Sequence, residues 1–398
     1  MSKDKKRLVP VRRFKEFENS AAWEQRKLGE IVKVTIGEFV IKTKQKEDSP
    51  YPVYNGGTSY TGFYDDYNNS PNKIIISARG ANAGFVNIVR QRYWAGNSCY
   101  SLSIINNQEV DLDYLYQMLK QRQHLFTDFQ QAANIPSVSK KDVETFIIYT
   151  SSFEEQKKIG EFLIKFDSLI ALHQRKLDKL KRVKSAYLTE LFPAEGEREP
   201  KRRFPGFTGA WEQRKLGEVA EKITKGTTPH DKRWFGPVNY VKTESIDSNN
   251  GNISVVANTS LEEHEGYLKR SQLEKDDVLF SIVGTLGRVG VVKKKDLPAN
   301  TNQQICIIRP FKENSFFLLN ALKTNRVKSF IKSDATIGAQ PSLSLWQIEG
   351  LRIPFPILEE QQKIGKFFQQ LDSLIALHQR KLDKLKKMKA AYLNEMFV

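Results

Sequence analysis

Cysteine and histidine, from which disulfide frameworks and most metal sites are built, are scarce in this sequence. Its 398 residues include two cysteines, Cys99 and Cys306, in separate apolar segments, and five histidines without a His-x-x-x-His pair or a Cys/His cluster. These features exclude a disulfide scaffold and a structural zinc site. We expect both thiols to be free and buried in a protein of the reducing cytoplasm.

Long apolar runs and familiar catalytic motifs are missing as well. No hydrophobic run approaches the roughly 18 residues of a membrane span, and the Lys-rich residues 1–13 lack the apolar stretch of a signal peptide. There is no Gly-x-x-x-x-Gly-Lys-Ser/Thr phosphate loop, no dinucleotide-binding Gly-x-Gly-x-x-Gly and no Asn/Asp-Pro-Pro-aromatic loop of amino-methyltransferases. The pairs Asp65-Asp66 and Asp276-Asp277 are interpreted as solvated turns in preference to a nuclease site. The sequence therefore predicts no catalytic residue, no metal site and no cofactor bound by this chain.

Positive charge, in contrast, is in excess. Lys and Arg number 63 against 46 Asp and Glu, which gives a formal net charge of +17. A cationic protein is attracted to an acidic polymer before any specific contact forms, so the charge favours a nucleic acid as partner. An anionic membrane and a merely basic soluble protein are the alternatives.

An internal repeat dominates the sequence. Trp23–Glu30 (WEQRKLGE) returns unchanged as Trp211–Glu218, and each copy follows an Arg-Arg-Phe-x-x-Phe stretch. Glu154–Phe192 returns as Glu359–Phe397 with 28 of 39 positions identical. The two matches have offsets of 188 and 205, so the material between them is 17 residues longer in the second half. The chain is one ancestral unit in two copies.

The longer repeated block is predicted to be helical. Apolar residues recur in Glu154–Phe192 at steps of three or four, and Gly160 is the only internal break. A helix of this length measures roughly 58 Å, and its single apolar seam needs a partner, for which the duplicate is the nearest candidate. We predict antiparallel pairing of the two helices, with His173 and His378 half-buried at the interface. The predicted seam is Ile159, Phe162, Phe166, Leu169, His173, Leu177, Leu180, Tyr187 and Leu191.

The segments inside the repeated ends, 31–149 and 219–355, are unlike each other. Three short matches align: Ser77-x-x-Gly80 with Ser281-x-x-Gly284, Asn97 with Asn302, and Pro136-Ser137-x-Ser139 with Pro341-Ser342-x-Ser344. Apolar runs predict strands, and two further segments predict helices. The predicted strands are 73–77, 100–105, 278–283 and 305–308, and the predicted helices are 113–129 and 316–332.

The predicted fold class is α+β, with two mixed α/β domains joined by two long helices packed as an antiparallel coiled coil and related by a pseudo-two-fold internal repeat. The predicted parts are a first module with its WEQRKLGE motif at 1–153, a long helix at 154–192, a linker at 193–210, a second module at 211–358 and a second long helix at 359–398.

Polar, aromatic and glycine-rich loops in both modules suit contacts with DNA. An Arg or Asn at a hairpin tip can make bidentate contacts to guanine or adenine, and Gly lets the backbone approach the sugar-phosphate closely. Any one of these loops is as consistent with a plain turn, but together, on a chain of this charge, they favour DNA binding. The candidates are Asn55, Thr58, Ser59, Tyr60, Arg79, Asn82, Asn97, Ser98, Asn134, Thr227, Thr228, Lys232, Arg233, Thr285, Arg288, Asn302, Gln303, Gln304 and Gln340.

The order of these parts resembles the specificity subunit of type I restriction-modification systems. The matching signatures are WEQRKLGE at 23–30 and 211–218, Pro-Ser-x-Ser at 136–139 and 341–344, and Glu-Glu-Gln-x-Lys-Ile-Gly at 154–160 and 359–365. Each is weak alone, but in this order and in duplicate they are specific, and the resemblance covers essentially the whole chain.

The resemblance implies a non-catalytic protein of the bacterial cytoplasm that binds double-stranded DNA. Each module would be a target recognition domain for one half of an asymmetric two-part site, and the helices would set the unread gap. Two modification subunits would dock on the helices and the WEQRKLGE motifs and methylate adenine with S-adenosylmethionine, while restriction subunits would use ATP and Mg to translocate and cleave DNA. The alternatives are a coiled-coil adaptor with two protein-binding modules and a nuclease or methyltransferase with a diverged site.

Overall fold

The computed structural model describes residues 8–129, 136–336, 338 and 340–398. It divides into two compact units: the first holds the chain up to Gln174 together with Arg380–Val398, and the second is Arg175–Gln379. The long helices α3 (Phe153–Glu190) and α9 (Leu358–Met396) each contribute to both units. Among the helices of these described residues, none combines the length and the apolar character needed to cross a membrane.

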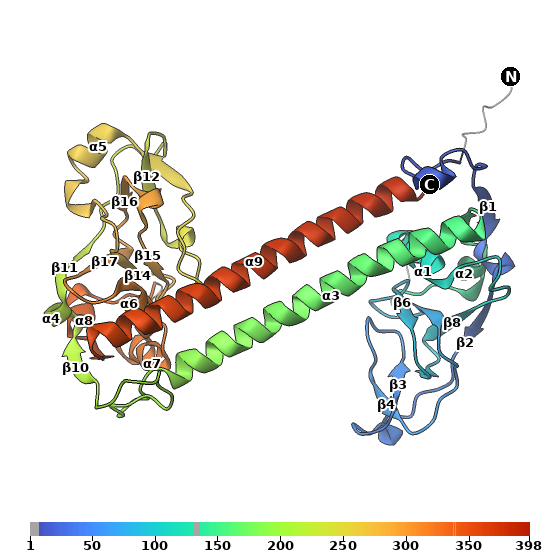
Figure 1. Ribbon diagram of the computed structural model, residues 1–398, viewed down its shortest axis with the longest axis horizontal. Coiled ribbons are helices and arrows are strands. Elements are labelled where there is room, and N and C mark those ends of the chain that lie inside the picture. Colours follow the sequence, from blue (N-terminus) through green and yellow to red (C-terminus); the bar gives the residue numbers. More distant parts are fainter. Residues whose placement is uncertain (1–7, 130–135, 337, 339) are drawn as a thin grey trace. The chain divides into compact units, whose positions relative to one another are not determined.

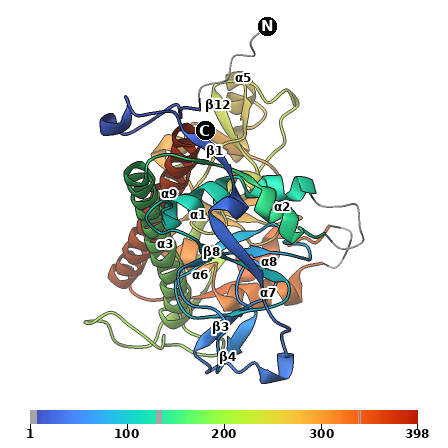
Figure 2. The same ribbon diagram turned by 90° about the vertical axis from the view of Figure 1, so that its right-hand side faces the viewer.

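A four-stranded antiparallel sheet is the centre of the first module. Its strand order is β2 (Val32–Ile36), β8 (Cys99–Ile104), β5 (Lys73–Ser77) and β6 (Val86–Val89). Apolar side chains of β5 and β8 are fully buried against α1 (Leu112–Gln121), which lies between the sheet and α3 (Figure 2). The predicted strands 73–77 and 100–105 are confirmed, while the predicted helix 113–129 is α1 followed by a 3-10 helix that ends at Phe129.

A smaller sheet extends the first module away from the long helices (Figures 1 and 2). In this sheet β3 (Tyr51–Tyr54) lies between β4 (Gly62–Tyr64) and β7 (Trp94–Ala95), antiparallel to the first and parallel to the second. It has its own apolar cluster around the buried Tyr93 and Cys99. Both cysteines are free and buried as predicted, and burial raises the pKa of the Cys99 thiol to about 12.

The second module repeats this topology although its sequence differs. Its sheets have the orders β11-β17-β14-β15 and β13-β12-β16, which correspond strand for strand to β2-β8-β5-β6 and β4-β3-β7. The connections on both sides of β13 are longer than those on both sides of β4, so the extra residues of the second half lie around the small sheet. The strands are β11 (Ala220–Lys225), β12 (Val238–Val241), β13 (Ala257–Thr259), β14 (Val278–Ser281), β15 (Val289–Val291), β16 (Ala299–Thr301) and β17 (Ile305–Pro310).

Short helices and two strand pairs complete the modules. The predicted helix 316–332 is two helices, α6 and α7, separated by a turn. The WEQRKLGE motif forms β1 in the first unit and β10 in the second, and each pairs with the last strand of its module. The elements are β1 (Glu24–Lys27), α2 (Lys140–Thr145), β9 (Ile147–Thr150), β10 (Glu212–Lys215), α4 (Leu216–Val219), α5 (Leu261–Glu265), α6 (Ser315–Ala321), α7 (Asn325–Asp334), α8 (Leu345–Gly350) and β18 (Arg352–Phe355).

The long helices pair antiparallel in each unit, as predicted. In the first unit Phe162 and Phe166 of α3 contact Tyr392 near the end of α9, with ring centroids 4.9 and 5.5 Å apart. In the second unit Tyr187 near the end of α3 contacts Phe367 near the start of α9, with ring centroids 4.9 Å apart. The early part of one helix therefore meets the late part of the other in both units.

The predicted helix seam needs one correction. Ile159, Phe166, Leu177 and Leu191 are buried and His173 and His378 are half-buried, but 44% of Leu169 is exposed. Leu163, which the prediction left out, is fully buried. The run Phe162-Leu163-Ile164 offers apolar side chains in three directions, so spacing alone did not identify the inward one.

The repeated WEQRKLGE motif is anchored by its tryptophan. Trp23 is buried between Tyr114 of α1 and Phe397, with ring centroids 5.8 and 6.3 Å away. Trp211 occupies the same position in the second unit and contacts Phe192, with ring centroids 6.0 Å apart. Each motif therefore packs against the end of the helix that belongs to the other repeat.

The repeated Glu-Glu-Gln motif holds the start of each long helix. The Glu155 carboxylate is 1% exposed and accepts two hydrogen bonds from Arg13, at 2.7 and 2.6 Å. Glu360 and Arg203 make the same bidentate pair at 2.8 and 2.7 Å. Removing one member of such a buried pair leaves an uncompensated charge, so a single substitution at either position should be strongly destabilising.

The glycine of the same motif permits a close approach. A Cβ on Gly160 would lie 2.6 Å from Asp111 Oδ1 and 2.8 Å from Tyr114 N, because the N-terminus of α1 sits directly against α3. Gly365 is equally close to the N-cap of α6.

We expect Gly160→Ala to lower the melting temperature. Alanine normally favours a helix interior over glycine, but here overpacking should cost about 1–3 kcal/mol, or roughly 5 °C by calorimetry. Gly350→Ala, at the end of α8, is the control, because its Cβ would meet no described atom within 4 Å, and it should leave the melting temperature unchanged or raise it slightly. Equal melting temperatures for both variants would contradict the close approach.

Candidate nucleic-acid interface

The short sequence matches of the first module converge at one end of its central sheet. Ala78, directly after β5, donates from its N to Ser98 O at 2.8 Å and accepts at its O from Val138 N at 2.9 Å. Gly80 N donates to Pro136 O at 2.9 Å. The segments after β5, before β8 and around Pro-Ser-x-Ser therefore form one joined loop region.

The second module builds the same region from different residues. Ile282 N donates to Gln304 O and Ile282 O accepts from Leu343 N, both at 2.8 Å. Gly284 N donates to Pro341 O at 2.9 Å, as Gly80 does to Pro136. Gly284 and Gly80 have φ of +75° and +89°, where other residues are strained. Two of the three sequence matches, Ser-x-x-Gly and Pro-Ser-x-Ser, thus form the framework of this loop region. The match of Asn97 with Asn302 is one residue out of register, because the strand pairing places Asn97 at the position of Gln303.

Most predicted site residues of the first module are at this end of the sheet. Thr58, Ser59, Tyr60, Arg79 and Asn82 are exposed, and Asn55, Asn97 and Ser98 are half-buried. Asn55 has a structural duty, because its Oδ1 accepts from Ser98 N at 3.1 Å and so ties the loop after β3 to the loop before β8. Asn134 lies outside the described residues.

The predicted residues of the second module fall into two places. Asn302, Gln303, Gln304, Thr285, Gln340 and Thr227 lie at the loop region, and Thr228 joins it by a hydrogen bond to Gln303. Asp231 N donates to Glu263 of α5 at 3.0 Å, which places Lys232 and Arg233 beside the small sheet instead.

Two charged residues are already engaged within the second module. Arg288 donates to Thr243 O and Ile246 O at 3.2 and 3.3 Å, so its guanidinium braces the connection that precedes β13. The interpretation of Asp276-Asp277 as a solvated turn is wrong for Asp277, which is fully buried and accepts from Arg309 at 2.8 and 3.0 Å. The acidic pair stands directly before the apolar strand β14, and its position in the sequence does not show whether its side chains are exposed or buried.

One connection at the same end of the sheet was missed. Gly37 N donates to Cys99 O at 3.1 Å as the chain leaves β2, and the following connection carries Phe39 with Lys42 and Lys44. Phe39 is 73% exposed, and Phe235 in the corresponding connection after β11 is 86% exposed. Two features of the sequence could have indicated this connection. One is the series of lysines at every second position from Lys42, and the other is Gly37, which corresponds to Gly226.

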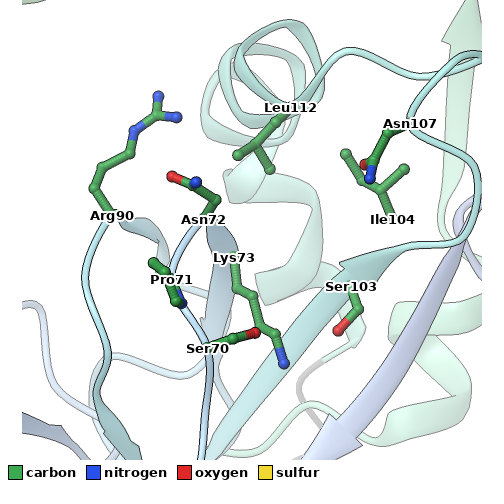
Figure 3. A pocket seen from close by; sticks show the side chains of 9 residues that line it. All are labelled: Ser70, Pro71, Asn72, Lys73, Arg90, Ser103, Ile104, Asn107 and Leu112. Carbon is green, nitrogen blue, oxygen red and sulfur yellow. The ribbon is translucent and has the colours of Figure 1, made fainter.

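A polar pocket marks the opposite end of the first sheet. Lys73 at the start of β5, Arg90 after β6, and Ser103 at the end of β8 line it with Asn107 (Figure 3). Lys73 donates to Asn69 Oδ1 at 3.0 Å, and burial, with Lys33 nearby, lowers its pKa. These cations lie a strand length from Arg79 and are separate from the loop region. Over the described residues, no three His, Cys, Asp or Glu side chains are arranged to hold a metal ion.

The comparison with known families decides the identity of the chain. The family model described as the type I restriction modification DNA specificity domain matches residues 21–182 and again 209–387. The chain belongs to this family. It is therefore the DNA specificity subunit, the non-catalytic component, of a type I restriction-modification system, and the resemblance seen in the sequence is confirmed.

Similar proteins agree with this specificity subunit over nearly its whole length. It is 26% identical over 394 residues to the type I restriction enzyme MjaVIII specificity subunit of Methanocaldococcus jannaschii, covering 94% of this chain and 91% of that protein. Its fold is similar to the crystal structure of a type I restriction-modification system S subunit from M. genitalium, with a TM-score of 0.73, 20% identity and coverage of 98% and 99%. The predicted fold of two α/β domains with two paired long helices is confirmed.

We expect Arg79→Ala to relax the sequence preference of the specificity subunit at one base position. A bidentate contact to a base edge contributes about 1–3 kcal/mol of discrimination, measurable by competition between duplexes that differ at single positions. Arg92→Ala is the charge-matched control, because Arg92 stacks on Tyr67 at the other end of the sheet. Equal weakening on all sequences, with a shallower salt dependence, would instead assign Arg79 to a phosphate.

Proposed function

We propose that each module of this specificity subunit reads one half of an asymmetric, two-part DNA site, and that the paired helices set the gap between the halves. One observation carries the proposal: two modules with the same strand order and the same loop framework present different side chains on that framework. A shared framework favours the same kind of ligand, and different side chains favour different base sequences.

The differences lie where base contacts would be made. After the matched glycines the first module has Ala81 and Asn82, whereas the second has Thr285 and Leu286. Both modules keep the strand order, and the connections at the loop region carry different side chains, which suits recognition of two unlike half-sites.

The long helices also suit docking of two equivalent partners. Leu169 and Leu172 of α3 return as Leu374 and Leu377 of α9, and between 38% and 45% of each is exposed. Exposed leucines at repeated helix positions favour a protein partner. We infer that two modification subunits dock on the helices and the WEQRKLGE motifs in the cytoplasm and methylate adenine with S-adenosylmethionine. Restriction subunits that use ATP and Mg complete the complex.

The decisive experiment is methylome sequencing of cells that carry this chain with its modification subunit. The proposal predicts methyl-adenine within one asymmetric motif of two short halves separated by a fixed number of unspecified base pairs. Cells with the modification subunit alone provide the baseline. One continuous motif, or none above the baseline, would refute the two-part reading.

Exchange of one module tests the division of labour between them. Replacing residues 31–149 with the corresponding module of another family member should change one half of the methylated motif and leave the other half and the gap unchanged. The reciprocal exchange of residues 219–355 is the matched control and should change the other half. A change in both halves after a single exchange would show that the modules do not read independently.

A further inference from the structure

Each unit contains an ion pair between the two long helices, at matching positions of the repeat. Asp167 Oδ1 of α3 accepts from Lys389 Nζ of α9 at 2.6 Å, and Asp372 Oδ1 of α9 accepts from Lys184 Nζ of α3 at 2.6 Å. The side chains of Lys389, Lys184 and Asp372 are only 15%, 13% and 16% exposed, and that of Asp167 is 37% exposed. Partial removal from water strengthens these pairs relative to surface ion pairs, whose contribution is about 0–1 kcal/mol.

The recognition module supplies a third partner to each pair. In the first unit Gln117 of α1, which is fully buried, donates from Nε2 to Asp167 Oδ2 at 2.6 Å. In the second unit Lys184 Nζ donates to Asn249 O at 2.6 Å, in the connection between β12 and β13. The first module binds the carboxylate of the interhelix ion pair, and the second module binds its ammonium group. The ion pair between the helices is therefore the same in both units, whereas the contact from the module differs.

A second lysine lies near each interhelix ion pair and adds positive charge around the aspartate. Lys120 lies on the face of α1 near Lys389, and Lys323 follows α6 near Lys184. Burial, together with the neighbouring lysine, lowers the pKa of both Lys120 and Lys323 to about 8. Asp167 and Asp372 partly oppose this lowering of the pKa, because the negative charge of each favours the charged form of the second lysine near it.

Such clusters specify arrangement more than they add stability. Apolar contacts along the helix seam are non-directional and tolerate small shifts, whereas a partly buried ion pair with a third hydrogen-bond partner favours one geometry. The same cluster joins both helices and the module within each unit. It is therefore the contact best suited to hold the module at one angle on the helix pair.

We propose that the Asp167–Lys389–Gln117 cluster and the Asp372–Lys184–Asn249 cluster are positioning devices that fix each recognition module on the helix pair and thereby restrict the gap between half-sites. The inference rests on the two-part reading proposed above. Asp167, Asp372 and Gln117 are positioning residues in this scheme and do not touch DNA.

The test uses the full complex with its modification subunit and synthetic duplexes that contain both half-sites at the native gap or at a gap one base pair longer or shorter. Asp167→Asn and Gln117→Leu should each lower the preference for the native gap by about tenfold, within the range of coupling between contacting residues. The preference for bases within each half-site should stay unchanged. Asp65→Asn, which breaks an exposed ion pair with Lys46 in the same module, should keep the parental gap preference.

A charge exchange gives the rescue arm. In the double variant Asp167→Lys with Lys389→Asp the pair is reversed, and Gln117 can then offer its Oε1, a buried atom without a hydrogen-bond partner among the described residues. This variant should regain the parental gap preference.

The outcomes separate the two proposals. Parental gap preference in soluble Gln117→Leu and Asp167→Asn complexes, with only a lower melting temperature, would overturn the positioning role; if Asp167→Asn fails to fold, Gln117→Leu decides. Failure of the parent complex to prefer any gap would instead overturn the two-part reading itself.

Discussion

The antiparallel pairing of α3 and α9 is the constraint on which the rest of the structure depends. The aromatic contact between Trp23 and Phe397 requires the end of the second repeat's helix beside the first module, and Trp211 requires Phe192 in the same way. Parallel helices would bring the wrong ends to both tryptophans. The core of each module includes residues from the end of the helix of the other repeat, so the two repeats complete each other's cores.

The repeated motifs and the variable modules divide the work between them. Buried Glu155, its bidentate Arg13 and the unsubstituted Cα of Gly160 serve the joint between helix and module, and none of them is exposed enough to meet DNA. The candidate base-reading side chains, which differ between the modules, stand on connections that leave one end of a retained sheet. A specificity subunit can therefore change its loops without disturbing the joint, because the two sets of residues do not overlap.

The sequence predicted those parts of the fold that have a periodic or repeated signature. Heptad-like spacing identified both long helices, and duplication identified their pairing. The sequence did not show that the modules share one strand order. Backbone hydrogen bonds determine strand pairing, and it can stay the same after the side chains have diverged. Leu163 and Asp277 were misplaced for a related reason: burial depends on which neighbour covers a residue, and spacing gives no neighbour. For the candidate site, residue chemistry indicated most of the loops, while the hydrogen bonds of Arg288 within its own module and the exposure of Phe39 could be seen only in the structure.

The contact of Trp23 with Phe397 also bears on biosynthesis. The second unit is one continuous stretch of chain and can complete its core as it is made, but the core of the first unit includes Met396 and Phe397. At about 5–20 residues per second, the ribosome needs roughly 10–40 s to travel from the end of the first module's own helix segment to these residues. The module that is made first is thus finished last, and its unfilled apolar face is a natural substrate for chaperones during that interval.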